Sequence, residues 1–161
     1  MKLPQSPGLA RLALAVVVMA ALAGCASTRI YPNKGPANLV IRSKVEAREG
    51  LLSSAAVALH VHRVESRCKT SYEGMVLLDA PETRVALLPD QPVLLVFTFA
   101  SKDFLSGGGS VRHDMLLVAR SGFTYTADAS YVRGIYDVVL REAKAGMGPG
   151  RVIEARPLPP C

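Results

Sequence analysis

Three histidines are the side chains whose type and spacing best suit chemistry in this chain. His60 and His62 flank Val61, and two strand residues at positions i and i+2 point to the same face of a sheet. Two imidazoles on one face can meet one metal ion, and His113 with Asp114 could supply further ligands if their strand lies adjacent. A zinc ion held in this way could activate a water molecule. One hypothesis is therefore a metal-binding protein that uses His60, His62 and His113.

The neighbours of the first two histidines favour a different interpretation. Val57, Leu59 and Val61 alternate with His60 and His62, which is the pattern of a strand with one buried and one solvated face. In that case the imidazoles are surface side chains without a metal. The sequence does not tell which strands are adjacent, so both interpretations stay open at this point.

Other catalytic constellations lack the motifs that would position them. His113, Asp79 or Asp114 and one of many serines could form a hydrolase triad, yet no Gly-x-Ser-x-Gly nucleophile elbow is present. The glycine-rich residues 106–110 lack the Lys-Ser/Thr pair of a phosphate-binding loop, and we expect a flexible hairpin connection there. Because function must be argued from a site, we expect a non-enzymatic protein without a cofactor.

Cys25 ends a segment with the layout of a bacterial export signal. Lys2 and Arg11 precede the apolar residues 12–23, and small residues stand directly before the cysteine. The apolar run is about a dozen residues long, whereas spanning a bilayer takes roughly 20. The tetrapeptide Leu22-Ala23-Gly24-Cys25 resembles the lipobox of bacterial lipoproteins, in which cleavage falls before a cysteine instead of after an Ala-x-Ala site.

The resemblance to lipoproteins implies that residues 1–24 are a cleaved signal peptide. It also implies that Cys25 carries a thioether-linked diacylglycerol and an acylated amino group, which anchor a protein far more stably than one chain can. Lipoproteins retained in the inner membrane tend to have Asp after this cysteine, and here the residue is Ala26. We therefore expect lipid anchoring in the bacterial outer membrane, with a domain that faces the periplasm. Residues 25–37, which contain Pro32 and Pro36, are predicted to be a flexible tether.

The composition of the mature chain limits the classes of partner that we expect it to bind. Removing residues 1–24 from the 161 leaves 137, which suits one domain. Loss of Lys2 and Arg11 leaves 17 basic residues against 13 acidic ones, a formal charge of about +4. No block of basic residues with interleaved aromatic residues suggests nucleic acid binding. The membrane and a protein of the cell envelope are the expected partners.

Cys68 and Cys161 remain once Cys25 is lipidated, and an exported protein meets oxidising conditions. One intramolecular disulfide would fix the C-terminal tail to the domain. Closing a loop of roughly 90 residues is worth about 4–5 kcal/mol in the chain-entropy model. The alternative is a disulfide from Cys161 to another protein, because this cysteine ends a proline-rich tail.

Residues 38–161 contain short apolar or alternating runs separated by turn residues. Eight or so such runs, with turns every 8–12 residues, predict an all-β fold, a small antiparallel β-sandwich. Residues 93–99 are apolar on both faces, which indicates a central strand. Residues 51–58 are ambiguous between a short helix and a strand, and residues 141–145 could form a turn. The predicted strands cover residues 39–46, 57–62, 75–78, 85–88, 93–99, 115–119, 123–129, 131–140 and 152–155.

Two turn segments in residues 38–161 resemble those of a known class of domain. Leu88-Pro89-Asp90 before one strand and Gly122-Phe123-Thr124-Tyr125 at the start of another resemble small transthyretin-like or immunoglobulin-like envelope domains. Because the chain has a lipobox and the sequence shows no catalytic site, we expect a sandwich that binds or scaffolds a partner in an envelope or secretion assembly. Phe104 and Leu105, beside the glycine-rich loop, are the predicted partner contact. A partner could also add a strand to an open sheet edge.

Overall fold

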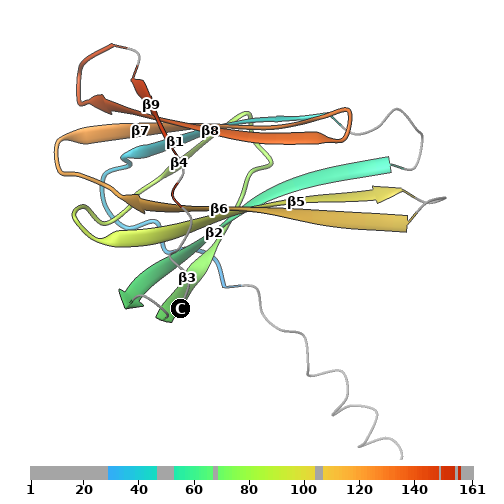
Figure 1. Ribbon diagram of the computed structural model, residues 1–161, viewed down its shortest axis with the longest axis horizontal. Helices are drawn as coiled ribbons and strands as arrows, with labels where there is room; N and C mark the ends of the chain where they lie inside the picture. Colours follow the sequence, from blue (N-terminus) through green and yellow to red (C-terminus); the bar gives the residue numbers. More distant parts are fainter. Residues whose placement is uncertain are drawn as a thin grey trace, which may run out of the picture.

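The computed structural model describes residues 29–46, 53–66, 69–103, 107–148, 150–154 and 156. Within these ranges every regular element is a β-strand. No helix in the described ranges is long and apolar enough to cross a membrane. The described strands form two sheets that pack face to face (Figure 1), which confirms the predicted all-β sandwich.

The four-stranded sheet has the order β3-β2-β5-β6, and all of its pairings are antiparallel. Its strands are β2 (Ser53–Ser66), β3 (Lys69–Leu77), β5 (Pro92–Asp103) and β6 (Gly107–Val118). The central position of β5 confirms the prediction made from its apolar residues on both faces. A strand between two neighbours has no free edge, so β2 and β5 are paired along both of their edges.

The five-stranded sheet has the order β4-β1-β7-β8-β9. Its strands are β1 (Leu39–Val45), β4 (Glu82–Val85), β7 (Phe123–Val132), β8 (Ile135–Lys144) and β9 (Arg151–Ile153). β1 and β7 run parallel. The sequence predicted an antiparallel sandwich, and this one pair of strands departs from that prediction. A parallel pair needs a long connection between its strands, and here most of the domain lies between them.

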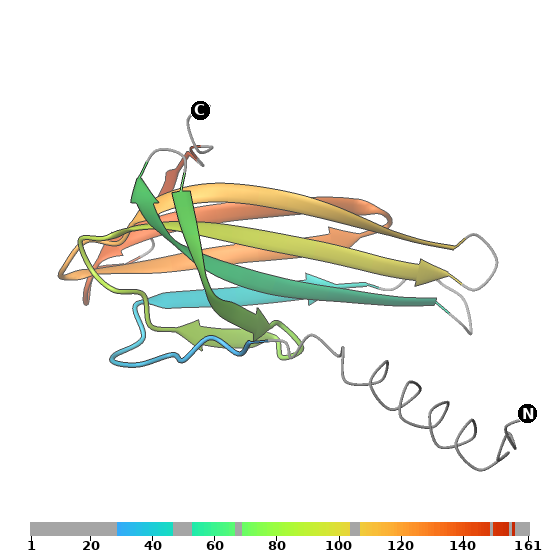
Figure 2. The same cartoon turned by 90° about the horizontal axis from the view of Figure 1, so that it is seen from below.

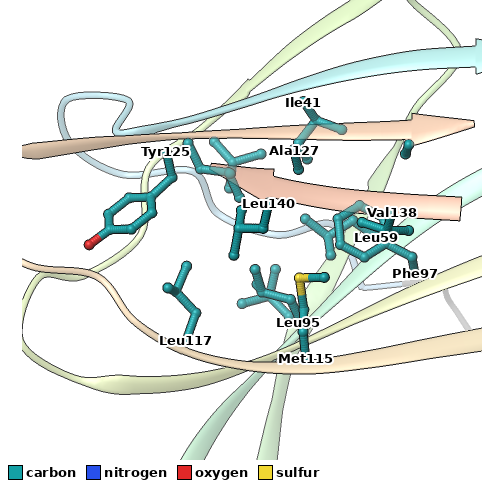
Figure 3. Packing of buried hydrophobic residues seen from close by; sticks show 14 of the residues in the cluster. Ile41, Leu59, Leu95, Phe97, Met115, Leu117, Tyr125, Ala127, Val138 and Leu140 are labelled. Carbon is teal, nitrogen blue, oxygen red and sulfur yellow. The ribbon is translucent and has the colours of Figure 1, made fainter. Parts of the chain in front are cut away.

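Apolar side chains at alternate strand positions fill the space between the sheets (Figure 3). Leu59, Phe97 and Met115 project from the four-stranded sheet, and Ile41 and Tyr125 project from the other. Each of these five side chains is at most 1% exposed. Burying one such side chain contributes about 1.5–3 kcal/mol, so this core is the main stabilising element of the fold.

Two ambiguous segments proved to be strands. Residues 53–58 begin β2 and pair with β5, so the described part of the segment 51–58 is not a helix. Residues 141–144 pair with β7 as part of β8, and only Ala145 lies in the following turn. In both cases the pairing of a neighbouring strand decides a conformation that local propensity leaves open.

Glycines mark two further differences from the predicted strands. Residues 107–109 begin β6 and pair with the end of β5, so these three glycines are not part of the connection between the strands. The single strand predicted over residues 131–140 is interrupted by a turn at Arg133 and Gly134, whose φ angles are 53° and 83°. Positive φ at both central residues characterises the two-residue hairpin turn that suits the twist of paired strands.

Residues 29–38 are hydrogen-bonded to the sandwich, although the sequence predicted a flexible tether up to residue 37. The Tyr31 N–H donates to the Met75 carbonyl of β3 at 2.9 Å, and Ile30 forms a parallel bridge with Met75. The Tyr31 hydroxyl donates to the Ala86 carbonyl at 2.9 Å, and Asn33 Oδ1 accepts from the Ala86 N–H at 2.6 Å. Residues 29–38 therefore belong to the folded domain, because their backbone pairs with β3 and their side chains satisfy backbone groups of the chain after β4.

Gly74 provides the space in which this segment lies. Its φ is +147°, and a Cβ at this position would be 2.6 Å from the Tyr31 Cα and 2.8 Å from the Ile30 carbonyl carbon. Any side chain would collide with backbone atoms of the segment, so glycine is required here on both conformational and steric grounds.

The two lateral sides of the sandwich consequently differ. On the side where β3 and β4 are the edge strands, residues 29–38 cover both sheets; this segment is blue in Figure 2. We name it the β3/β4 side. On the opposite side, β6 ends one sheet and β8 with the short β9 ends the other. We name it the β6/β8 side.

Candidate functional site

Several predicted site residues lie outside the residues that the structure describes. They are Cys25, Cys68, Cys161, Phe104 and Leu105. The lipid attachment, the disulfide and the partner contact at these positions therefore remain predictions.

The structure separates the three histidines that were considered as metal ligands. His60 and His62 lie on the outer face of the four-stranded sheet, opposite the buried Leu59. His113 lies on the inner face, because it pairs with Phe97, which in turn pairs with Leu59. The three imidazoles do not converge, and among the described residues no three His, Cys, Asp or Glu side chains form a metal-binding group.

His60 and His62 instead contact Tyr72 of β3. The ring centroids of His60 and His62 lie 6.0 Å and 5.1 Å from that of Tyr72. Burial, and then the charge of Arg112, lowers the pKa of both imidazoles. Arg112 itself is held by Asp114, with a 2.6 Å bond from Nε to the carboxylate. This cluster is a half-buried aromatic patch that favours neutral histidines.

A second cluster surrounds Glu142 of β8, the one charged side chain that is buried among the described residues, at 7% exposure. Its Oε2 accepts a hydrogen bond from Arg120 Nη2 at 2.8 Å. Its Oε1 accepts from Arg151 Nε and Nη2 at 2.9 Å and 2.6 Å. Arg120 follows β6 and Arg151 begins β9, so one carboxylate ties three segments together.

Further contacts fix Arg120 in place. Its backbone N–H donates to the Tyr125 hydroxyl at 2.9 Å, and its guanidinium lies 3.9 Å from the centroid of the Phe123 ring, in a cation–π contact. Burial is the largest single influence on Glu142 and raises its pKa. The bonds and charges of Arg151 and Arg120 together outweigh burial and hold this pKa below its usual range. Glu142 therefore stays ionised and keeps both guanidinium groups oriented.

A cleft of about 580 Å³ opens beside this cluster on the β6/β8 side. Arg120, Arg151 and Arg156 line it together with Glu142 and Glu154, so its charged side chains have a positive excess. Apolar residues of β6 and β9 form the rest of its wall: Leu116, Leu117, Val118, Val152 and Ile153. Guanidinium groups bind planar oxyanions through paired hydrogen bonds, so the cleft suits a carboxylate on an otherwise apolar segment.

Beyond the cleft, the β6/β8 side has free strand edges. Within the described residues, β9 pairs with residues 140–142 of β8, and Arg156 bridges to Leu116 of β6. In that part of the chain, residues 107–115 of β6 and 135–139 of β8 have no strand on their outer edge. Val111, Ile135 and Tyr136 are exposed there. Open edges with apolar side chains are surfaces to which another strand can add.

Comparisons with protein-family models, with curated proteins and with solved structures found no match to this chain. Function must therefore be argued from the residues and their arrangement.

The sequence reasoning missed the cluster around Glu142. The residues that contact it lie 22 and 9 positions away in the sequence, so no local motif marks them. One signal was present: Val138, Leu140 and Glu142 alternate on the inward face of β8. A charged residue at a buried strand position demands partners of opposite charge.

Proposed function

We propose that this protein is a non-enzymatic lipoprotein of the bacterial outer membrane. Cys25 would carry the lipid, and the periplasm-facing sandwich would bind or scaffold a protein partner in an envelope or secretion assembly. The observation that carries the proposal is the difference between the lateral sides. The chain that arrives from the lipobox covers the β3/β4 side, whereas the β6/β8 side offers free strand edges beside an arginine-lined cleft.

Strand addition is the mode of binding that these edges support. A partner segment that pairs with β8 would gain main-chain hydrogen bonds along residues 135–139. It would also cover the side chains of Ile135 and Tyr136, which are 73% and 40% exposed. Tyrosine is enriched among the residues that dominate interface energies. Phe104 and Leu105, in the connection between β5 and β6, remain proposed contacts of the same partner.

The arginine cleft would add specificity to this binding. Glu142 already orients Arg120 and Arg151, so an acidic side chain or terminal carboxylate of the partner would meet guanidinium groups that need little reordering. Arg156 supplies a further positive charge at the cleft. An acidic partner segment therefore fits this site better than a basic one.

We also propose that a disulfide between Cys68 and Cys161 closes the domain. Arg156 is bridged to Leu116 of β6, and Cys161 lies five residues further along the chain. Leu116 lies across β5 from His62, and Cys68 lies six residues after His62. A bond between the two cysteines would therefore need a tail that extends both across β5 and along β2.

Processing of the precursor tests the anchor. In bacteria expressing the full chain, inhibiting lipoprotein signal peptidase with globomycin should cause a larger precursor to accumulate. The wild-type protein should fractionate with the outer membrane, and Cys25→Ala should not. Normal processing in globomycin together with membrane fractionation of Cys25→Ala would refute lipid anchoring.

Site-specific crosslinking tests the partner surface. A photo-crosslinking amino acid at position 135, on the open edge of β8, should give one discrete larger species in intact cells. The matched control is position 42, an exposed residue on the outer face of the central strand β1. Equal crosslinking from both positions, or none from either, would count against a partner at the β6/β8 side.

A further inference from the structure

We propose that the β3/β4 side of the sandwich lies on the lipid surface, with Ile30, Leu77 and Leu88 at the membrane interface. The inference rests on the proposed lipid at Cys25 and adds an orientation to it. It concerns a contact with lipid, separate from the partner contact on the opposite side.

The first argument is the length of chain between the lipid and the domain. Only residues 26–28 separate Cys25 from Arg29, the first described residue of the segment that docks on β3. Four Cα-to-Cα steps span at most about 14 Å when fully extended. Ile30 and Tyr31 are fixed to β3 by the bridge and hydrogen bonds at Met75. These docked residues therefore do not lengthen the connection between Cys25 and the domain. The β3/β4 side is therefore held within about 14 Å of the lipid attachment point.

The second argument is the set of exposed apolar side chains near the docked segment. Ile30, Leu77 and Leu88 are 65%, 53% and 53% exposed. Ile30 is bridged to Met75, which pairs with His60 and lies two residues from Leu77, so Ile30 and Leu77 lie where the outer face of the four-stranded sheet meets its β3 edge. Leu88 lines a shallow cavity together with Tyr31. Apolar side chains gathered around a lipid anchor gain free energy when the acyl–headgroup boundary covers them.

Charge at this side fits the same surface. Arg29 is exposed, and its guanidinium donates to the Tyr72 carbonyl at 3.3 Å at the edge of β3. A basic side chain next to the anchor is attracted to anionic headgroups. The exposed Ile135 and Tyr136 belong to the opposite side, so they cannot touch the bilayer while the β3/β4 side does.

The chain contains no tryptophan, so a single introduced tryptophan reports on one position. We would prepare the variants Leu77→Trp and Leu88→Trp and the matched control Tyr136→Trp. Each lipidated protein would be reconstituted into vesicles of phosphatidylethanolamine and phosphatidylglycerol with brominated acyl chains, which quench nearby tryptophan. Emission from positions 77 and 88 should fall at least twofold relative to unbrominated vesicles. Emission from position 136 should be unchanged.

Two readouts separate failure of this inference from failure of the proposed function. Mass spectrometry of the Cys25 peptide and flotation with vesicles establish the lipid anchor before quenching is read. A lipidated, vesicle-bound protein whose emission at positions 77 and 88 is quenched no more than at position 136 would overturn the membrane contact. Using two test positions guards against one variant that fails to fold, which circular dichroism would reveal.

Discussion

Replacing Gly74 by alanine should release the N-terminal segment from β3. The new methyl group would stand 2.6 Å from the Tyr31 Cα and nitrogen, well inside van der Waals contact. These are backbone atoms, so no side-chain rotation relieves the collision. The segment around Tyr31 must move away, and the two hydrogen bonds between Met75 and residues 29 and 31 must break.

The size of the effect follows from two contributions. Each of the two backbone hydrogen bonds contributes about 1 kcal/mol net. Alanine at a φ of +147° adds strain of about 1–3 kcal/mol. We expect a loss of about 3–5 kcal/mol in the free energy of unfolding, and for a domain of this size the melting temperature should fall by roughly 10 °C or more.

Thermal denaturation and amide exchange test this prediction together. Gly74→Ala should melt earlier than the wild type, and the amide hydrogens of Tyr31 and Met75 should exchange faster. Gly109→Ala is the matched control, because a Cβ there meets no atom within 4 Å; it should change the melting temperature little. If Gly74→Ala melts within 1 °C of the wild type and the Tyr31 amide stays protected, the docking of residues 29–38 is refuted.

Three further predictions concern Glu142, Tyr125 and the cysteines. Glu142→Gln should cost about 1–2 kcal/mol at pH 7 after discounting for the exposed arginines. The folded-state pKa of Glu142 lies below its ordinary 4.5, so this stabilisation is complete above pH 4.5 and disappears as the pH falls through the folded-state pKa. Urea titrations of the wild type and Glu142→Gln should show that their difference in unfolding free energy is smaller at pH 3 than at pH 7. An equal difference at both pH values would contradict the ion pairs. Tyr125→Phe should cost about 1 kcal/mol, because the Arg120 N–H loses its 2.9 Å acceptor; unchanged urea denaturation would rule this out. Cys161→Ser should lower the melting temperature only under non-reducing conditions, and a larger band on a non-reducing gel of the wild type would instead indicate a bond to another protein.

Periodicity was sufficient to predict the class of fold and much of its core. Alternation at Leu59 and Val61 of β2, and at Tyr125 and Ala127 of β7, places these residues inward, and all four are buried. The apolar run in β5 indicated a central strand for the same physical reason. Such patterns are local, so one sequence reveals them.

Long-range contacts could not be predicted in this way. The parallel pairing of β1 with β7, the docking of Tyr31 on β3 and the arginines at Glu142 all join residues far apart in the sequence. The turn at Arg133 and Gly134 does have a local signal, since a glycine in a two-residue turn marks a hairpin. The separation of His113 from His60 depended on the pairing of three strands, which no spacing encodes.

The mass of the N-terminal peptide of the mature protein, taken from bacterial membranes, tests the central claim most directly. Lipid anchoring predicts a peptide that begins at Cys25 and carries a diacylglycerol together with an amide-linked acyl chain. A peptide that begins at another residue, or an unmodified Cys25, would contradict the anchor and with it the orientation of the domain on the membrane.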